Sequence, residues 1–587
     1  MKNRKYMIVI SFALAAAMLT GCSSVQSNTE SGHITQKKEP TAAAESLIVS
    51  DDTLTEPIVV EEAVSSGAEP ESDEVLITLN DSDGSVRITE AGTYRLTGTL
   101  TNGQIVIEAA EDAKVKLILD GVSIRAEGNA AIYAISADKL IVVSAEGSTN
   151  LLESVGDFVQ TDDNKVDAAI FAKCDLNLNG DGELGIRCET GHGVVSKDDL
   201  KVKDGIVSIE AAGQGLSGKD SVTVEGGTLS IVSGTDGIHS ENEDTEKGNI
   251  EILGGSIYIQ SSTDGVDAYG FILVEGGNLT LISGSRDSSE SCKGLKADTD
   301  ISVNGGILTI ASYDDAIHAN GSVTVNGGEL NLASADDGVH ADGELIIQDG
   351  MVTVTQSYEG LEAQSITING GVISIVASDD GLNASGGNDG SNAWGPRGGD
   401  PFTSDANAVL TINGGTLTVN AEGDGLDSNG QLLVNGGTVY VSGPTNGGNG
   451  ALDYGSGASI TGGTLIAAGS SGMAENFGAS STQGSILLNV GNQAAGTTIT
   501  VTDESGSVLA SFSPEKSYQT VVVSTEGLTL GGSYTVTAGT YSETITLNSL
   551  IVGSGMGMSG QMGGPSAQMG GGPGGQGGFG GGPGGRR

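Results

Sequence analysis

The sequence predicts an all-β fold, a parallel β-helix, and two observations support this prediction. Glycines that close Asn-Gly-Gly or Asp-Gly turns recur about every 22 residues, at Gly306, Gly328, Gly350, Gly371, Gly415 and Gly437. A fixed period of this size indicates stacked units. Each period also holds three short runs of alternating apolar and polar residues, which indicates strands cut by glycine turns. We expect a solenoid with about 22 residues and three strands per coil.

The first 22 residues have the pattern of a secretory signal peptide. Three basic residues, Lys2, Arg4 and Lys5, precede an apolar run from Tyr6 to Leu19. The closing Leu19-Thr20-Gly21-Cys22 resembles the lipobox of bacterial lipoproteins, which implies that Cys22 becomes the lipidated first residue of the mature chain. We therefore expect an exported protein whose lipid anchors it to the outer face of the bacterial cell membrane. The alternative is an ordinary signal peptide in which the cysteine is incidental.

Composition divides the remaining chain into four parts. Residues 23–73 are rich in Ser, Thr, Ala, Pro and Glu without a period, which predicts a flexible tether. The repeats predict the parallel β-helix over residues 74–479. Alternation continues over residues 480–552 after the Asp-Gly turns have ended, which predicts a small C-terminal β cap or module. The Gly- and Pro-rich residues 553–587 predict a disordered tail.

Charge and cysteine usage restrict partners and cofactors. A net charge of -49 repels the phosphates of nucleic acids, so we expect no nucleic-acid partner, and outside a cell it favours divalent cations. Cys174, Cys188 and Cys292 lack the spacing of metal ligands. Buried thiols are favoured over a Cys174–Cys188 disulfide, because 14 residues do not match a whole coil.

We expect the protein to be a monomer that contacts the membrane only through its lipid anchor.

An acidic strip follows one corner of the predicted coils. Two residues after the glycine of each Asp-Gly turn stands one residue per coil, which together we call the strand column: Val195, Ser217, His239, Asp267, Lys296, His318, His340, Glu362, Asn383 and Asp427. Alternation places Val339 and Ala341 inside and the strand column outside, so it should be exposed. The acids that precede the glycines, which we call the turn acids, run alongside from Asp236 to Asp424.

Calcium explains this density of carboxylates. Two carboxylates on neighbouring rungs, roughly 4.8 Å apart, repel by roughly 3 to 4 kcal/mol at an effective dielectric constant of about 20. Ca²⁺ takes about six to eight oxygen ligands and cancels that repulsion. The alternative is that Asp-Gly is turn chemistry and the acids are solvated, but this leaves the acids of the strand column unexplained. The predicted calcium ligands are Asp236, Asp264, Asp267, Asp314, Asp315, Asp336, Asp337, Glu359, Glu362, Asp379, Asp380, Asp424 and Asp427.

Three insertions, residues 241–249, 284–292 and 386–407, border the same strip. Insertions gathered on one face of a solenoid usually mark its binding face. The third insertion carries the only tryptophan of the chain, and an exposed aromatic ring there can stack on a sugar. A transition-metal site at the histidines is the less favoured alternative, because no cysteine joins them. The residues predicted to contact a carbohydrate are His239, Lys293, Lys296, His318, His340, Trp394 and Arg397.

Several short sequence motifs occur together and in a fixed order. They are Ala131-Ile132-Tyr133, Ser136-Ala137-Asp138-Lys139-Leu140, Ser196-Lys197-Asp198-Asp199-Leu200, Gly218-Lys219-Asp220-Ser221-Val222 and the Asp-Gly-Val-His/Asp-Ala strands. Over roughly residues 75–550 the chain thereby resembles bacterial carbohydrate-binding lipoproteins. The resemblance implies a right-handed parallel β-helix, a fold shared with pectate lyases, bound Ca²⁺, and binding of plant-type polysaccharides, namely cellulose and polygalacturonate.

Three functions are therefore weighed. The favoured one is a non-catalytic surface lipoprotein that binds acidic plant-type polysaccharide (polygalacturonate or pectin) or cellulose through calcium on the acidic strip. The second is a calcium-dependent pectate lyase in which Lys293 or Lys296 removes a proton. Against it, a lysine stacked on acids should keep its proton. The third is an adhesin or structural surface protein without a glycan ligand.

Overall fold

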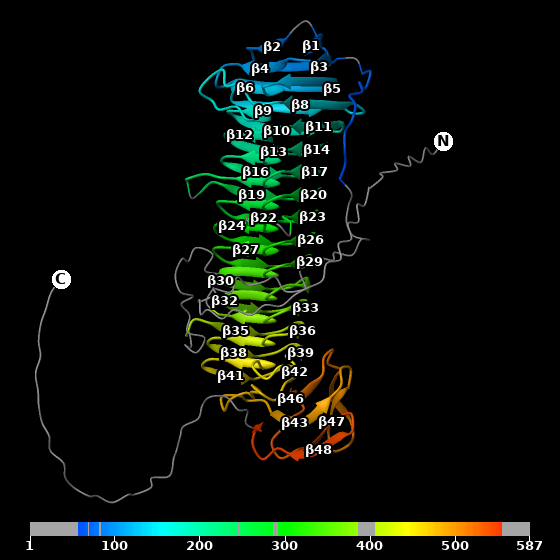
Figure 1. Cartoon of the computed structure of the whole chain (residues 1–587), viewed down its shortest axis with the longest axis vertical. Helices are drawn as coiled ribbons and strands as arrows, with labels where there is room; N and C mark the ends of the chain where they lie inside the picture. Colours follow the sequence, from blue (N-terminus) through cyan, green and yellow to red (C-terminus); the bar gives the residue numbers. More distant parts are fainter. Residues whose placement is uncertain are drawn as a thin grey trace, which may run out of the picture. The chain divides into compact units, whose positions relative to one another are not determined.

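The computed structural model describes residues 57–553, except residues 69, 82–83, 245, 286–287, 289–290 and 386–405. This part of the chain is all-β, and none of it forms a helix that could cross a bilayer. Most of its strands join one large, mostly parallel sheet, as expected of a β-solenoid (Figure 1). The signal peptide with Cys22, the carbohydrate-contact candidates Trp394 and Arg397, and residues 554–587 lie outside the described residues.

Parallel pairing sorts the strands into three ladders, in which each strand pairs with a strand of the following coil (Figure 1). The first, which we call the acidic ladder, carries the strand column. Its strands are β2 (Ser85–Ile88), β4 (Gln104–Glu108), β6 (Ile132–Ser136), β9 (Ala168–Ala172), β12 (His192–Ser196), β15 (Leu216–Gly218), β18 (Ile238–Ser240), β21 (Val266–Ala268), β24 (Leu295–Ala297), β27 (Ile317–Ala319), β30 (Val339–Ile347), β32 (Leu361–Ile368), β34 (Leu382–Ala384), β37 (Leu426–Ser428) and β40 (Leu452–Tyr454).

The second ladder lies beyond the next corner, and the long strands β30 and β32 turn that corner and belong to both. Its other strands are β1 (Glu74–Leu79), β3 (Gly92–Leu100), β5 (Lys114–Glu127), β7 (Lys139–Ser144), β10 (Asp175–Gly180), β13 (Asp199–Val202), β16 (Ser221–Val224), β19 (Asn249–Ile252), β22 (Ile272–Val274), β25 (Ile301–Val303), β28 (Val323–Val325), β35 (Val409–Ile412), β38 (Gln431–Val434) and β41 (Gly457–Ile460).

The third ladder begins where the end of β3 pairs with the second half of β5, and its strands precede the acidic turns. Its strands are β8 (Thr149–Val155), β11 (Glu183–Cys188), β14 (Ile206–Ala211), β17 (Thr228–Ser233), β20 (Ser256–Ser261), β23 (Asn278–Ser283), β26 (Ile307–Ser312), β29 (Glu329–Ser334), β31 (Met351–Gln356), β33 (Val372–Ala377), β36 (Thr416–Ala421), β39 (Thr438–Ser442) and β42 (Thr464–Gly469).

One continuous apolar core lies between the ladders. In a single coil it takes Leu330 and Leu332 from the third ladder, Val339 and Ala341 from the acidic ladder, and Leu345 from the second. All five are at most 1% exposed. Because successive side chains of a strand point to opposite faces, this inward set leaves the residues between them, including the strand column, on the outside of the coil.

Two kinds of glycine set the corners. Gly328, in an Asn-Gly-Gly turn, has a φ of 96°, a left-handed conformation that favours glycine. Gly338, in an acidic turn, is needed for a different reason, since a Cβ there would lie 2.5 Å from the carbonyl oxygen of Gly360 one coil further on. The Asp-Gly pair therefore recurs because consecutive acidic turns stack closely.

Pairing becomes antiparallel after β42. Strand β46 (Tyr518–Ser524) pairs with β42 and with β43 (Ser485–Gln493), and β43 also pairs with β49 (Ile551–Val552). A separate antiparallel sheet shares a second apolar cluster with β42, β43 and β46. It contains, in spatial order, β45 (Val508–Phe512), β44 (Ile499–Thr502), β47 (Ser533–Ala538) and β48 (Tyr541–Thr546).

Among the described residues all cysteines are free and buried: Cys174, Cys188 and Cys292. The favoured prediction of buried thiols is confirmed, and the Cys174–Cys188 disulfide is not formed. Burial raises the pKa of the Cys174 thiol to about 11, which keeps it protonated and unreactive.

Candidate functional site

The strand column is aligned as the repeats predict. Parallel register joins Val195 to Ser217, Ser217 to His239, and so on coil by coil as far as Asn383 and Asp427. Residues of this column that are far apart in the sequence therefore become neighbours on adjacent rungs. The turn acids run beside the column at the corner that precedes it.

The expected exposure of the column is wrong for most of its central residues. His340 is fully buried, and His239, Asp267, His318 and Asn383 are between 6% and 8% exposed. These side chains do leave the apolar core, as alternation predicts. They are covered because a rung above, a rung below and the turn acids at the corner surround each of them. Charge on this strip is therefore held at low dielectric, where unpaired carboxylates are costly.

The aspartates among the turn acids each have one oxygen committed to the fold. Asp315 Oδ1 accepts the backbone N–H of Asp337 at 3.0 Å, and Asp337 Oδ1 accepts that of Glu359 at 3.2 Å. The same bond joins Asp264 to the backbone of Lys293 at 2.7 Å, one coil on. Turn chemistry thus accounts for one oxygen of these carboxylates. The other oxygen remains for the strand column.

In the first half of the strip, cations neutralise the acids. We call this the compensated segment, from Asp236 to His340. Lys296 Nζ lies 2.9 Å from Asp267 and 3.3 Å from Asp264. Lys293 Nζ lies 2.8 Å from Asp315 Oδ2, and 2.9 Å from the acid that precedes Asp315, Asp314. Its acids therefore already have partners.

Those ion pairs decide the protonation of both lysines. Burial by itself lowers the pKa of Lys293, but the facing Asp315 and Asp314 outweigh it and raise that pKa above its usual value. The pKa of Lys296 is raised in the same way by Asp267 and Asp264, against the effect of burial. Both side chains are thus firmly held ammonium ions rather than bases.

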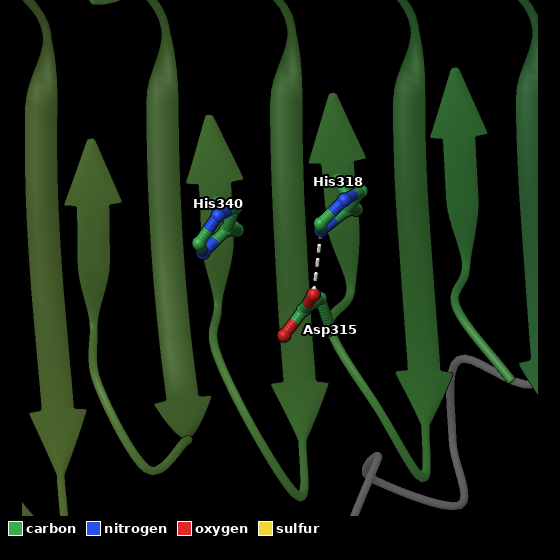
Figure 2. A group of neighbouring side chains, drawn as sticks. All are labelled: Asp315, His318 and His340. Atoms are coloured by element: carbon green, nitrogen blue, oxygen red, sulfur yellow. Dashed lines mark hydrogen bonds and ion pairs between the residues drawn. The ribbon is translucent and has the colours of Figure 1, made fainter. Parts of the chain in front are cut away.

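Two stacked histidines end the compensated segment (Figure 2). The rings of His318 and His340 lie 4.8 Å apart with an interplanar angle of 11°. His318 Nδ1 lies 2.8 Å from Asp315 Oδ2, the bond drawn in Figure 2, while His340 Nδ1 lies 3.0 Å from Glu362 and 3.2 Å from Asp337. Burial lowers the pKa of His340, but Asp337 and Glu362 raise it to about 11. A charged imidazolium has no free lone pair, so His340 serves as a counter-ion to the acids.

The arrangement changes after His340. We call the following part the uncompensated segment, and it contains Glu359, Asp379, Asp380, Asp424, Asp427, Asp453 and Glu475. Within the described residues, no lysine, arginine or histidine forms an ion pair with any of these seven. When these carboxyls are ionised, no cationic side chain of the described residues pairs with them.

Burial and mutual repulsion shift these carboxyls strongly. Burial, then the neighbouring Glu362 and Asp337, raise the pKa of Glu359 to about 10. Burial and the facing Asp424 raise that of Asp380 to about 8. Burial raises the pKa of Asp427 well above its usual value, with Asp380 and Asp424 adding to it. The segment is therefore unfavourable as a set of bare anions at neutral pH.

Two oxygens in the same segment are buried and accept no hydrogen bond from the described residues, Asn383 Oδ1 and Glu475 Oε2. The amide nitrogen of Asn383 donates to Glu359 Oε2 at 2.8 Å, which fixes the orientation of the Asn383 side chain. Its amide oxygen, Oδ1, then has no hydrogen-bond donor among the described residues. Carboxylate and amide oxygens are the ligands that Ca²⁺ prefers. The donor set and the two orphaned oxygens thus fit a hard divalent cation.

Asp453 and Glu475 are missing from the sequence prediction. Asp453 pairs with Asp427 in register, so the strand column continues one coil beyond its predicted end. Its turn reads Gly450-Ala451-Leu452-Asp453 and lacks both the acid and the glycine used for alignment. An alanine takes the place of this glycine at Ala316 as well, so the sequence already showed that the alignment could accept alanine there.

Comparison with known proteins finds one family model, one relative and one solved structure that are similar to this chain. Residues 82–338 match the model of a family described as carbohydrate-binding domain-containing protein. A protein of the same description from Acetivibrio thermocellus is 33% identical over 135 residues, which is 23% of this chain and 47% of that protein. The match thus spans about half the length of this relative. A solved structure, the polysaccharide lyase-like protein from C. thermocellum as its gadolinium derivative, shares 27% identity with a TM-score of 0.34, over 47% of this chain and 96% of that one. Residues 82–338 are therefore similar to the carbohydrate-binding domain-containing family, in agreement with the resemblance found in the sequence.

Proposed function

We propose that this chain binds polysaccharide along the acidic strip and that Ca²⁺ occupies the uncompensated segment. The supporting observation is the run of buried carboxylates that lack a cationic partner among the described residues. Rungs roughly 4.8 Å apart suit an ion that takes oxygens at about 2.3 to 2.6 Å from two coils at once. The residues that would hold it are Glu359, Asp379, Asp380, Asn383, Asp424, Asp427, Asp453 and Glu475.

This proposal narrows the set of calcium ligands expected from the sequence. Asp236, Asp264, Asp267, Asp314, Asp315 and Asp337 belong to the compensated segment, where most are paired with lysine or histidine. Asp336 is exposed beside Asp315, and Glu362 is paired with His340. A calcium ion there would have to displace a held cation. The ions are therefore proposed for the later coils.

We infer that the ligand is an acidic plant-type polysaccharide of the polygalacturonate or pectin type, with cellulose as the neutral alternative. A chain with a net charge of -49 repels a polyanion, so calcium must first neutralise the face that binds it. The three ladders with register steps near 22 residues support a right-handed parallel β-helix, because crossovers between parallel strands are almost always right-handed. The protein would be exported and anchored through Cys22.

The lyase alternative is not favoured. A base for proton abstraction must be unprotonated near neutral pH, whereas Lys293 and Lys296 each contact two carboxylates and have raised pKa values. We therefore expect no unsaturated product when pectate is added with Ca²⁺. Steady growth of ultraviolet absorbance from such a product would restore the enzyme hypothesis.

The binding function is tested by retention on polygalacturonate and on cellulose. In about 1 mM Ca²⁺, a concentration suited to extracellular sites, we expect the protein to be retained on polygalacturonate. Excess chelator should reduce retention at least about ten-fold, a change of about 1.4 kcal/mol. Retention that chelator leaves unchanged contradicts the role of calcium. A lack of retention on both polymers favours the adhesin or structural alternative.

A further inference from the structure

The acidic ladder contains a second feature, at its N-terminal end. A cavity of about 620 Å³ lies over β12, β15 and β18, a volume within the usual range for small-molecule sites. Its floor is formed by Val195, Ser217 and His239, which are consecutive members of the strand column. Three rungs span roughly 10 Å. The cavity therefore precedes the acidic part of the strip and uses the same face.

The edge of this cavity where the strands end carries two lysines. Lys197 and Lys219 occupy the same position in consecutive coils, because their backbone N–H groups donate to Ala172 and Ser196 of the preceding coils at 2.8 and 3.0 Å. Both side chains are exposed. In the described part of the chain, neither forms an ion pair, and Lys197 Nζ lies 5.3 Å from the ring centre of Phe171.

The opposite edge is uncharged where the rest of the strip is acidic. His192 and Gln214 take the positions that Asp236 and its successors occupy in later coils. His192 Nδ1 accepts the backbone N–H of Gln214 at 2.9 Å. Burial lowers the pKa of His192, so the ring is neutral at physiological pH. This edge offers an amide and an imidazole as hydrogen-bond partners.

The remaining end is closed by the insertion that begins at Glu241. Glu241, Asn242 and Glu243 line the cavity there. The amide of Asn242 donates to Asp220 at 2.6 Å, which holds the insertion against the corner. His239 lies 3.5 Å from Glu241, so the nearest acid at this end is already paired. The insertion thus bounds a groove that is open between the lysine edge and the neutral edge.

We propose that this cavity is a subsite for a short acidic saccharide that needs no metal. Its carboxylate groups would lie at Lys197 and Lys219, and its hydroxyls at Ser217, Gln214 and His192. Glu241 and Glu243 line only the end that the insertion closes. In a chain with a net charge of -49, Lys197 and Lys219 form no ion pair within the described residues, and they share the cavity with the uncharged edge at His192 and Gln214, so this part of the strip attracts an anion. The choice of a saccharide rests on the proposed function, whereas the anion preference rests on the cavity alone.

Calorimetric titration of the full chain with digalacturonate tests this subsite. The titration is run at low ionic strength with excess chelator, so that calcium sites do not contribute. Lys197→Gln with Lys219→Gln should weaken binding at least about ten-fold, and added salt should weaken binding to the unaltered chain. Lys201→Gln with Lys203→Gln is the control, because it removes the same charge from β13 and the turn after it, outside the cavity. It should leave the dissociation constant within about two-fold.

Equal affinities for the unaltered chain and the Lys197/Lys219 variant overturn the subsite. Inorganic phosphate that displaces digalacturonate at equal concentration overturns its assignment to a saccharide, and cellobiose bound as tightly as digalacturonate overturns the anion preference. Failure here is distinguishable from failure of the proposed function. Retention on polygalacturonate in Ca²⁺ tests the uncompensated segment, while digalacturonate with chelator tests only this cavity.

Discussion

A single carboxylate on the strip can both bind the backbone of the next coil and pair with cationic side chains, as Asp315 does. One oxygen holds the backbone of the next coil at Asp337, and the other contacts Lys293 and His318. Asp315 is 2% exposed, and its pKa is held below the usual range because His318 and Lys293 outweigh the effect of burial. Removing a cation from such a site leaves a buried charge unpaired, which costs far more than the pair contributes.

Lys293→Met should therefore destabilise the protein by about 3 to 5 kcal/mol. The methionine matches the length of the lysine but leaves Asp314 and Asp315 without their ammonium partner. Thermal unfolding at pH 7 measures the effect. Lys114→Met is the matched control, since its side chain is 69% exposed and lies 3.9 Å from Asp138. It should cost less than about 1 kcal/mol. Similar losses in the two variants would contradict the burial argument.

At the scale of an element, the acidic ladder has two parts, which differ in whether their buried carboxylates are paired with cationic side chains. The coils from β18 to β30 pair their carboxylates with lysine and histidine, and His340 also reaches Glu362 on β32. The acids of the uncompensated segment form no ion pair within the described residues. Alternation and spacing predicted which residues share the ladder. They did not predict burial, because the direction of a side chain does not say what covers it. They did not predict the division either, because it depends on which cations reach across rungs.

The pH dependence of stability follows from the raised pKa values. The carboxyls of Asp424, Asp380 and Glu359 have folded-state pKa values of about 7, 8 and 10, above the values near 4 expected when unfolded. The folded state then binds more protons, so stability falls as the pH rises from about 4 through about 10. In chelator we expect the melting temperature to drop by roughly 5 °C between pH 5 and pH 8. With Ca²⁺ the drop should disappear, and a drop of equal size in both conditions would contradict calcium binding here.

Asp380→Asn with Asp427→Asn separates stability from calcium binding. The amides keep the shape and the acceptor oxygen for the N–H of Asp424, but they remove two repelling charges. We expect the variant to melt higher than the unaltered chain in chelator at pH 8 and to lose most of the stabilisation by Ca²⁺. Asp204→Asn with Asp349→Asn is the control, because both are exposed acids in Asp-Gly turns at another corner. A control that loses the calcium effect equally would point to non-specific screening.

For the whole molecule, the repeat predicted most of the architecture. The 22-residue spacing correctly placed the strand column in register, from Val195 to Asp427. It missed Asp453, where the marker glycine is an alanine, and it gave no reason to single out the lysine edge at Lys197 and Lys219. The two omissions have different origins. The turn before Asp453 lacks both the acid and the glycine used for alignment, whereas the coils of Lys197 and Lys219 do align, but the prediction rested on carboxylates and so did not take in their cations.

The location of bound calcium tests the central claim most directly. Crystals grown with Ca²⁺ and measured at a wavelength where calcium scatters anomalously show where the ions lie. We expect anomalous peaks between coils in the uncompensated segment, within about 2.6 Å of oxygens from residues such as Asp380, Asn383 and Asp427. Peaks confined to the compensated segment beside Lys293 and Lys296, or no peak along the acidic ladder, would contradict the account.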